Sequence, residues 1–222
     1  MMRKIATAAA ALLLCGTQAF AFSDTSDLSA ESLNSINRLT ELGIVNGYED
    51  GTFRPHKDVT RAEAVTMLYN MIPFGDIGDV FYVSSTYSDV TQEHWAFGGV
   101  EVMSALGYIE GYPDGTFRPD ETITYAEAVK MIMDILNYSF VAEENGGYPN
   151  GYMSAAGWIA LSEGVELVYS AEVTREDLAV LIDNALDAPI MVISSYNTDG
   201  SAEYAPDTEL TLYKLMGYLD NV

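Results

Sequence analysis

The chain has 222 residues, of which 49% are hydrophobic, and this is enough for one or two globular domains with a sizeable core. Its 33 acidic and 10 basic residues give a formal net charge of −23. This acidity excludes nucleic acid as a partner, because binding to a phosphate backbone needs a basic surface. The single cysteine excludes an internal disulfide and a thiolate metal cluster.

The N-terminal residues are typical of a secretory signal peptide. Arg3 and Lys4 precede an apolar run over residues 5–15, and Ala19-Phe20-Ala21 has the small-x-small spacing of a signal-peptidase site. We therefore expect residues 1–21 to be removed, the cysteine with them. The apolar run is too short to cross a bilayer, which takes about 20 residues. No other stretch is long and apolar enough, so the protein is not expected to span a membrane.

The next predicted element is an amphipathic helix that ends at Gly43, where a left-handed conformation can stop it. Its apolar positions are Leu33, Ile36, Leu39 and Leu42. The loop GYEDGTFRP follows at residues 47–55, with a turn in which Gly51 supplies a positive φ. We expect Phe53 to point into the core and Arg54 to be extended, because a residue before proline avoids the helical region.

A second helix is predicted to begin after Thr60. Thr60 with Glu63 three residues later forms a capping box. The expected buried stripe of this helix is Ala62, Val65, Tyr69 and Ile72.

The same unit returns 64 residues later, which indicates a duplication. The loop is GYPDGTFRP at residues 111–119, and Thr124 with Glu127 repeats the capping box. The apolar positions expected in its two helices are Val100, Met103 and Leu106, with a stop at Gly107, and then Ala126, Val129, Ile132, Met133 and Leu136.

A third, degenerate copy follows a linker predicted over residues 142–147. Residues 158–164 resemble the end of a first helix, and Thr174 with Asp177 repeats the cap, with Leu178, Leu181, Ile182 and Leu186 as the apolar stripe. The spacing from Gly164 to Thr174 is 10 residues, against 17 from Gly107 to Thr124. Most of the loop is therefore lost from this copy.

This order of elements resembles the S-layer homology (SLH) repeat of bacterial cell-surface proteins. The order is a helix, the loop Gly-Tyr-x-Asp-Gly-Thr-Phe-Arg-Pro, the cap Thr-Arg-Ala-Glu and a second helix. Tyr87-Ser88-Asp89-Val90 with His94-Trp95-Ala96, and Phe22-Ser23-Asp24, are similar to the start of such a repeat. The resemblance implies a mainly α fold of three tandem helix-loop-helix repeats in a pseudo-threefold arrangement, with a small α/β C-terminal extension. The expected boundaries are residues 22–73, 86–138 and 148–187 for the repeats and 188–222 for the extension.

The resemblance also implies grooves between repeats that hold secondary cell-wall polysaccharide, including pyruvylated forms, or other peptidoglycan-associated polymers. The chain would be secreted and held non-covalently at the cell wall or surface layer, beside surface-layer proteins. No cofactor is expected.

The candidate ligand-binding residues are Arg61, Arg175, Trp95, Tyr125, Asp24 and Asp89. Arg61 and Arg175 follow a threonine cap, where free backbone N–H groups favour an anion and a guanidinium can clamp a carboxylate. The alternative is an arginine that only pairs with a neighbour such as Glu63 or Asp177. Tyr125 stands at the arginine position of the second repeat and cannot neutralise a carboxylate. Trp95 either stacks on a sugar or packs in the core.

A second group of residues is expected to shape loops and caps rather than to touch ligand. These residues are Gly47, Asp50, Gly51, Phe53, Thr60, Glu63, Gly111, Asp114, Gly115, Phe117, Thr124, Glu127, Thr174 and Asp177. Residues 110–121 follow a calcium-loop register only loosely, so no metal site is predicted. His56 and His94 have no nucleophile motif near them, so the sequence predicts no enzyme.

The extension is predicted to contain a strand at Ile190–Ile193, a turn at Asn197–Gly200 and a helix over Leu210–Leu219 behind a cap at Asp207. It supports an alternative function, in which the chain is an accessory or anchoring subunit of an extracellular enzyme and acts through protein contacts. An uncharacterised hydrolase is a third and weaker alternative.

Overall fold

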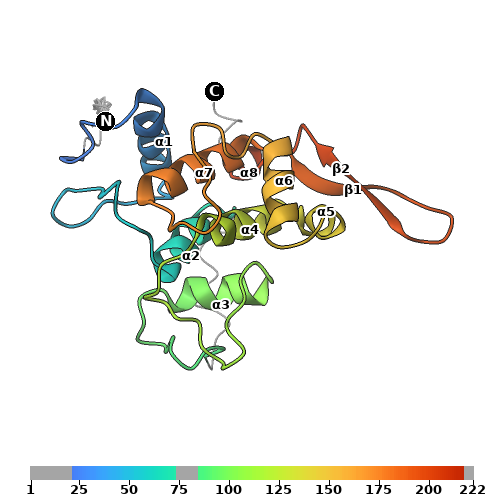
Figure 1. Ribbon diagram of the computed structural model, residues 1–222, viewed down its shortest axis with the longest axis horizontal. Helices are drawn as coiled ribbons and strands as arrows, with labels where there is room; N and C mark the ends of the chain where they lie inside the picture. The colour runs from blue at the N-terminus through green and yellow to red at the C-terminus, as the bar shows by residue number, and fades with distance from the viewer. Residues whose placement is uncertain (1–21, 74–84, 218–222) are drawn as a thin grey trace, which may run out of the picture.

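The computed structural model describes residues 22–73 and 85–217, and in these the chain is mainly helical with one small sheet (Figure 1). The expected fold class is confirmed, while the predicted signal peptide lies outside the described residues. The helices are α1 (Ala30–Glu41), α2 (Arg61–Asn70), α3 (Phe97–Ala105), α4 (Tyr125–Ile135), α5 (Ser139–Glu144), α6 (Asn150–Trp158), α7 (Arg175–Asp187) and α8 (Leu212–Leu215), and the strands are β1 (Ile190–Tyr196) and β2 (Ala202–Asp207).

A closed ring of three backbone hydrogen bonds lies at the centre of the fold. The N–H of Val59 donates to the carbonyl of Val173 (3.0 Å), that of Ile123 to Val59 (3.1 Å), and that of Val173 to Ile123 (3.0 Å). All three side chains are buried. Equivalent residues of three successive units thus meet around one axis, which gives the helical part its pseudo-threefold arrangement.

Each unit places its second helix directly after this ring, and the predicted caps are confirmed. Thr60 and Thr124 form complete capping boxes with Glu63 and Glu127, and Thr174 accepts a hydrogen bond from the N–H of Asp177. These bonds satisfy backbone N–H groups that a helix start leaves without partners.

The helices of neighbouring units pack against one another in a cyclic order. The first helix of each unit contacts the second helix of the unit before it: α3 packs on α2, α6 on α4, and α1 on α7. No unit therefore covers its own apolar stripe alone, and the stripes merge into a single core. The predicted stripes of α4 and α7 are buried throughout, whereas Leu106, predicted in the α3 stripe, is 42% exposed and lies just after the end of α3.

Both GYxDGTFRP loops are fixed by a carboxylate from the start of their own unit. In the second unit, Asp89 accepts hydrogen bonds from the N–H groups of Phe117 (2.7 Å) and Arg118 (2.8 Å), and Asp24 does the same for Phe53 and Arg54 in the first. The two phenylalanines are fully buried, as predicted.

The expectation that Arg54 is extended is wrong, and it is wrong for Arg118 as well. Both residues have a φ of 59°, in the left-handed region. That conformation lets two successive N–H groups point at one carboxylate. Each guanidinium is also held by the turn aspartate four residues earlier, at 2.9 Å from Asp50 and 3.2 Å from Asp114.

The carboxyl of Asp50 should titrate well below an ordinary aspartate. Hydrogen bonds from the hydroxyl of Thr52 and the guanidinium of Arg54 lower its pKa to about 2. Because the folded pKa is depressed, the stabilising contribution is fully present above the ordinary aspartate pKa of 3.8 and is lost as the pH falls through about 2. A carboxyl-carbon NMR titration of the folded chain checks this, and a midpoint near 4 for Asp50 would contradict the turn geometry.

A methyl group at Gly111 should destabilise the fold by about 2 kcal/mol, because overpacking of this kind forces neighbours to shift. The added Cβ would lie 2.7 Å from the carbonyl oxygen of Thr116 and closer still to the ring of Tyr87. Gly111→Ala is compared with Gly157→Ala in α6, where the added Cβ would have no atom within 4 Å apart from its chain neighbours and its own helix backbone. Urea midpoints measure both, and equal midpoints would contradict the packing.

Three details between and after the units differ from expectation. The predicted linker is partly helical, since α5 covers Ser139–Glu144 and buries Ala142. The cap of the last helix is Thr211 rather than Asp207, which ends β2. The extension also holds a second strand, β2, antiparallel to β1, and Figure 1 shows this hairpin projecting from the helices.

Candidate functional site

Two grooves lie at equivalent places in the first and second units. The Arg61 groove has a volume of about 360 Å³ and is lined by Arg61, Tyr108, Ile109, Glu110, Glu127, Lys130, Met131 and Tyr148. The Arg175 groove has a volume of about 190 Å³ and is lined by Ile44, Val45, Asn46, Gly47, Tyr48, Glu63, Thr66, Met67, Asn70, Trp95 and Arg175. Each groove therefore takes residues from all three units.

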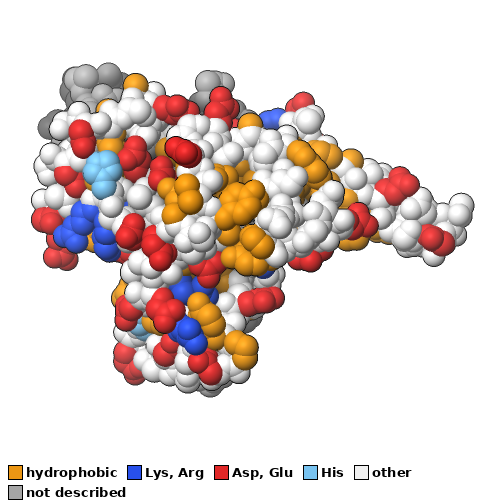
Figure 2. All heavy atoms as spheres, in the orientation of Figure 1, with side chains coloured by type: hydrophobic (Ala, Val, Ile, Leu, Met, Phe, Trp, Pro, Cys, Tyr) orange, Lys and Arg blue, Asp and Glu red, His pale blue; other side chains and the backbone are white. Residues whose placement is uncertain are grey.

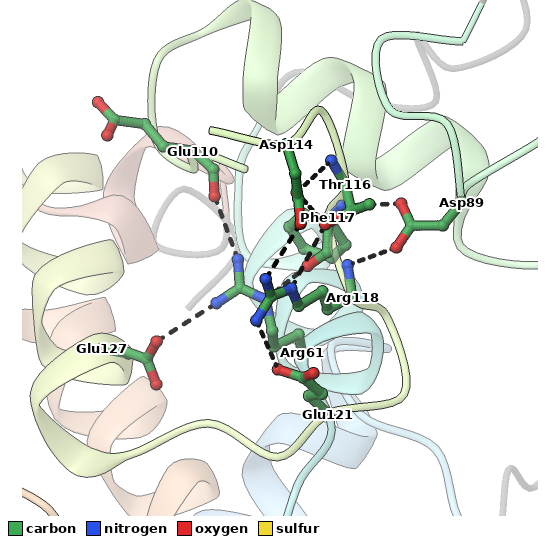
Figure 3. Close-up of polar contacts among 9 residues, drawn as sticks. All are labelled: Arg61, Asp89, Glu110, Asp114, Thr116, Phe117, Arg118, Glu121 and Glu127. Atoms are coloured by element: carbon green, nitrogen blue, oxygen red, sulfur yellow. Dashed lines mark hydrogen bonds and ion pairs between the residues drawn. The ribbon is translucent and has the colours of Figure 1, made fainter. Parts of the chain in front are cut away.

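Arg61 passes beneath the loop of the second unit and is 4% exposed. Its Nε donates to the carbonyl of Phe117 (2.8 Å), and Nη2 donates to the carbonyl of Glu110 (3.1 Å). Its guanidinium also lies over the Phe117 ring, 4.6 Å from the centroid. Figure 3 shows Arg61 pointing at these groups and at Glu127, while the carboxylate of Glu110 points away from it.

The side chain of Arg175 packs in the equivalent way under the loop of the first unit and is 7% exposed. Its Nη2 donates to the carbonyl of Asn46 at 2.7 Å, and the Phe53 ring lies under its guanidinium at 4.9 Å. Its Nη1 meets only the sulfur of Met67, at 3.7 Å, and its buried Nε has no hydrogen-bond acceptor within the described chain. Burial lowers the pKa of the guanidinium, because desolvation disfavours the charged form.

An exposed aromatic side chain from the next unit completes each groove. Trp95 lies in the Arg175 groove and is 63% exposed, and Tyr148 lies in the Arg61 groove and is 49% exposed. Each stands two residues before the first residue of a first helix, α3 or α6. The alternative of Trp95 packed in the core is thus excluded. Sequence reasoning missed Tyr148, although its place before α6 could have identified it.

Tyr125 takes the arginine position of the second unit but lines neither groove. Its hydroxyl donates to Asp177, which belongs to the cap of the third unit. Burial, and then the hydrogen bond to Asp177, raise the pKa of Tyr125 well above its usual value, so it stays neutral.

Asp24 and Asp89 are among the candidate ligand contacts, yet both oxygens of each carboxylate accept backbone N–H groups of the loops. Neither lines one of the two grooves. The structure thus gives them a loop-holding role, and a direct ligand contact by either remains a prediction.

Metal binding and membrane binding each place requirements on the rest of the described surface. On the face drawn in Figure 2, acidic side chains are scattered widely and hydrophobic ones gather near α4, α6 and α7. Residues 22–73 and 85–217 contain no group of three His, Cys, Asp or Glu side chains placed to hold a metal ion. Over the same residues, every helix is too short or too polar to cross a membrane.

Comparison with known proteins identifies two similar segments and several relatives. The family model of the S-layer homology domain matches residues 21–65 and 86–129. The chain is 32% identical over 93% of its length to the Middle cell wall protein of Brevibacillus brevis, and 31% identical over 96% to the Surface layer protein of Brevibacillus choshinensis. It is 42% identical over 44% of its length to the Cellulosome-anchoring protein of Acetivibrio thermocellus. These matches span 20%, 19% and 22% of the relatives, so the chain covers about a fifth of each.

Proposed function

The chain is an S-layer homology domain protein, and from this premise we propose that it anchors to the bacterial cell envelope by holding wall polysaccharide in its two grooves. It would act outside the cell, at the wall or surface layer, and without catalysis. The names of the relatives, a cell wall protein, a surface layer protein and an anchoring protein, support this setting.

We also propose that residues 148–187 form a third, shortened S-layer homology repeat. The support comes from the hydrogen-bond ring, in which Val173 occupies the place that Val59 and Ile123 occupy in the other units. The third repeat matters for binding even without a complete groove of its own. It supplies Arg175 to one groove and Tyr148 to the other.

The observation that carries the proposal is the pairing of a buried arginine with an exposed aromatic ring in both grooves. An aromatic face packs well against the apolar face of a sugar, and a guanidinium binds a carboxylate through two parallel hydrogen bonds. A ketal-linked pyruvate would present such a carboxylate. A wall polymer that carries acidic sugars therefore matches the chemistry of the grooves.

Co-sedimentation with isolated cell walls tests the proposal. Residues 22–222 should pellet with native walls and remain in solution with walls from which polymers other than peptidoglycan have been extracted. Failure to pellet with native, polymer-bearing walls would remove the proposal. Equal pelleting with extracted walls would redirect it to peptidoglycan itself.

The projecting hairpin favours protein recruitment as a second candidate function. Tyr196 and Ile193 on β1 are 70% and 47% exposed. Removal of the whole extension would also disturb the helical core, because Met191 is buried and its N–H donates to the carbonyl of Leu136. Replacement of residues 194–203 by a short turn removes the tip alone. Wall binding should survive this change, whereas recruitment of a partner protein would not.

A further inference from the structure

The two units carry opposite charges at equivalent positions 57 and 121, and the groove linings also differ in charge at Asn46 against Glu110 and at Thr66 against Lys130. The backbone plays the same part in both: the carbonyl of Lys57 accepts from the N–H of Arg175 (2.9 Å), and that of Glu121 accepts from the N–H of Arg61 (2.8 Å). The side chains have opposite charge. The exchange therefore alters the electrostatics of a groove without altering the chain path.

Lys57 holds the capping glutamate of the Arg175 groove. Its Nζ lies 2.7 Å from Oε1 of Glu63, and the hydroxyl of Tyr48 donates to the same oxygen at 2.8 Å. Burial disfavours the charge on Lys57, but the hydrogen bonds to Glu63 and Tyr48 outweigh it and raise the pKa of the lysine. Lys57 thereby offsets much of the charge of Glu63, which still acts on Arg175 at longer range, and within the described chain Arg175 forms no ion pair with a carboxylate.

The Arg61 groove has the opposite arrangement. Position 121 holds an acid, Glu121, which lies 3.8 Å from Arg118, so it cannot pair with Glu127 as Lys57 pairs with Glu63. Oε1 of Glu127 instead faces Nη1 of Arg61 at 3.5 Å (Figure 3). Glu110 also lines the groove, although its carboxylate points away from Arg61, and Lys130 is paired with Asp134 at 2.7 Å. Arg61 is therefore already partly neutralised by the protein.

We propose that Lys57 makes the Arg175 groove selective for anionic sugars, and that the Arg61 groove, with Glu121 in its place, lacks this selectivity. The inference rests on the proposed function and assigns a charge class to each groove. An anion in the Arg175 groove would offer a stronger acceptor to Nη1, which contacts the sulfur of the groove residue Met67, and it would find Glu63 already paired with Lys57. In the Arg61 groove the same anion would have to displace Glu127.

The two grooves can be observed separately. Trp95 lies in the Arg175 groove, and the chain has only one other tryptophan, Trp158. A Trp158→Phe background therefore makes tryptophan fluorescence a reporter of that groove. The amide NMR signals of Gly47 and Gly111 report the loops beside the Arg175 and Arg61 grooves respectively. The probe is a methyl hexoside with a 4,6-linked pyruvate ketal, and its methyl ester is the neutral control.

The acid should perturb Trp95 and Gly47 at lower concentrations than it perturbs Gly111, and the ester should show no such preference. Lys57→Glu should weaken binding of the acid at the Arg175 groove by at least about fivefold, because it reverses a partly exposed charge and one such interaction contributes up to about 1 kcal/mol. Lys57→Arg should retain it. Glu121→Lys should strengthen binding of the acid at Gly111.

Equal affinity of the acid for both grooves, equal affinity of acid and ester, or unchanged binding in Lys57→Glu would overturn the assignment. Absence of any response to the acid would overturn it as well. These outcomes are separable from failure of the proposed function, which is measured by the pelleting of the wild-type chain with native walls. A chain that pellets but shows no charge preference retains the function and loses the inference.

Discussion

Phe117→Ala should lower the free energy of unfolding by about 3–5 kcal/mol, the range for removal of a fully buried aromatic side chain. Phe117 is 0% exposed and lies where the loop of the second repeat meets the core. Its ring contacts Tyr87, with centroids 5.4 Å apart, and supports the guanidinium of Arg61. The substitution therefore opens a cavity and also removes the apolar floor beneath a buried charge. Urea unfolding followed by far-UV circular dichroism measures the loss.

Leu106→Ala is the matched control in the same repeat. Leu106 is 42% exposed, so its truncation should cost less than about 1 kcal/mol. Similar losses for Phe117→Ala and Leu106→Ala would contradict the conclusion that the loop phenylalanine is part of the core.

Arg175→Met should reduce affinity for an acidic wall polymer by about 10- to 100-fold, the equivalent of one charge-assisted hydrogen-bonded contact. The free energy of unfolding should stay within about 1 kcal/mol of the wild-type value or rise, because a buried charge without a carboxylate partner costs more to desolvate than a methionine of similar shape. Arg175 meets this condition, since its Nε has no acceptor in the described chain and burial lowers its pKa.

Arg38→Gln is the control for the loss of one positive charge. Arg38 pairs with Asp183 at 2.9 Å and Asp187 at 2.7 Å, and it lines neither groove. Its substitution should leave polymer binding unchanged. A large loss of stability in Arg175→Met with intact binding would assign Arg175 a structural role only.

Much of the fold follows from local signals in the sequence. The capping boxes at Thr60 and Thr124, the positive φ of Gly51 and the burial of Phe53 are confirmed, because each depends on chemistry within a few residues. The left-handed Arg54 was not foreseen. Its conformation is set by Asp24, a carboxylate 30 residues earlier in the chain that binds two successive N–H groups.

The grooves depend on contacts that no local pattern contains. The sequence offers a nearby carboxylate, such as Glu63 or Asp177, as the alternative partner of the groove arginines, but the cyclic packing brings Arg61 to Glu127 of the next repeat. The same packing brings Arg175 into contact with the carbonyl of Asn46, just before the loop of the first repeat, and places Tyr148 in the Arg61 groove. The repeat spacing reveals that Lys57 and Glu121 are at equivalent positions. The effect of this exchange on ion pairing by Arg61 and Arg175 could be seen only from the arrangement of the repeats in space.

The measurement that tests groove binding most directly is an amide chemical-shift map of the chain with solubilised native wall polymer. Anchoring through the grooves predicts saturable shifts at residues 44–48 and 108–112, together with a response of the Trp95 side chain. The hairpin Ile190–Asp207 should remain unshifted. Shifts confined to the hairpin, with both loops unperturbed at saturation, would contradict the account.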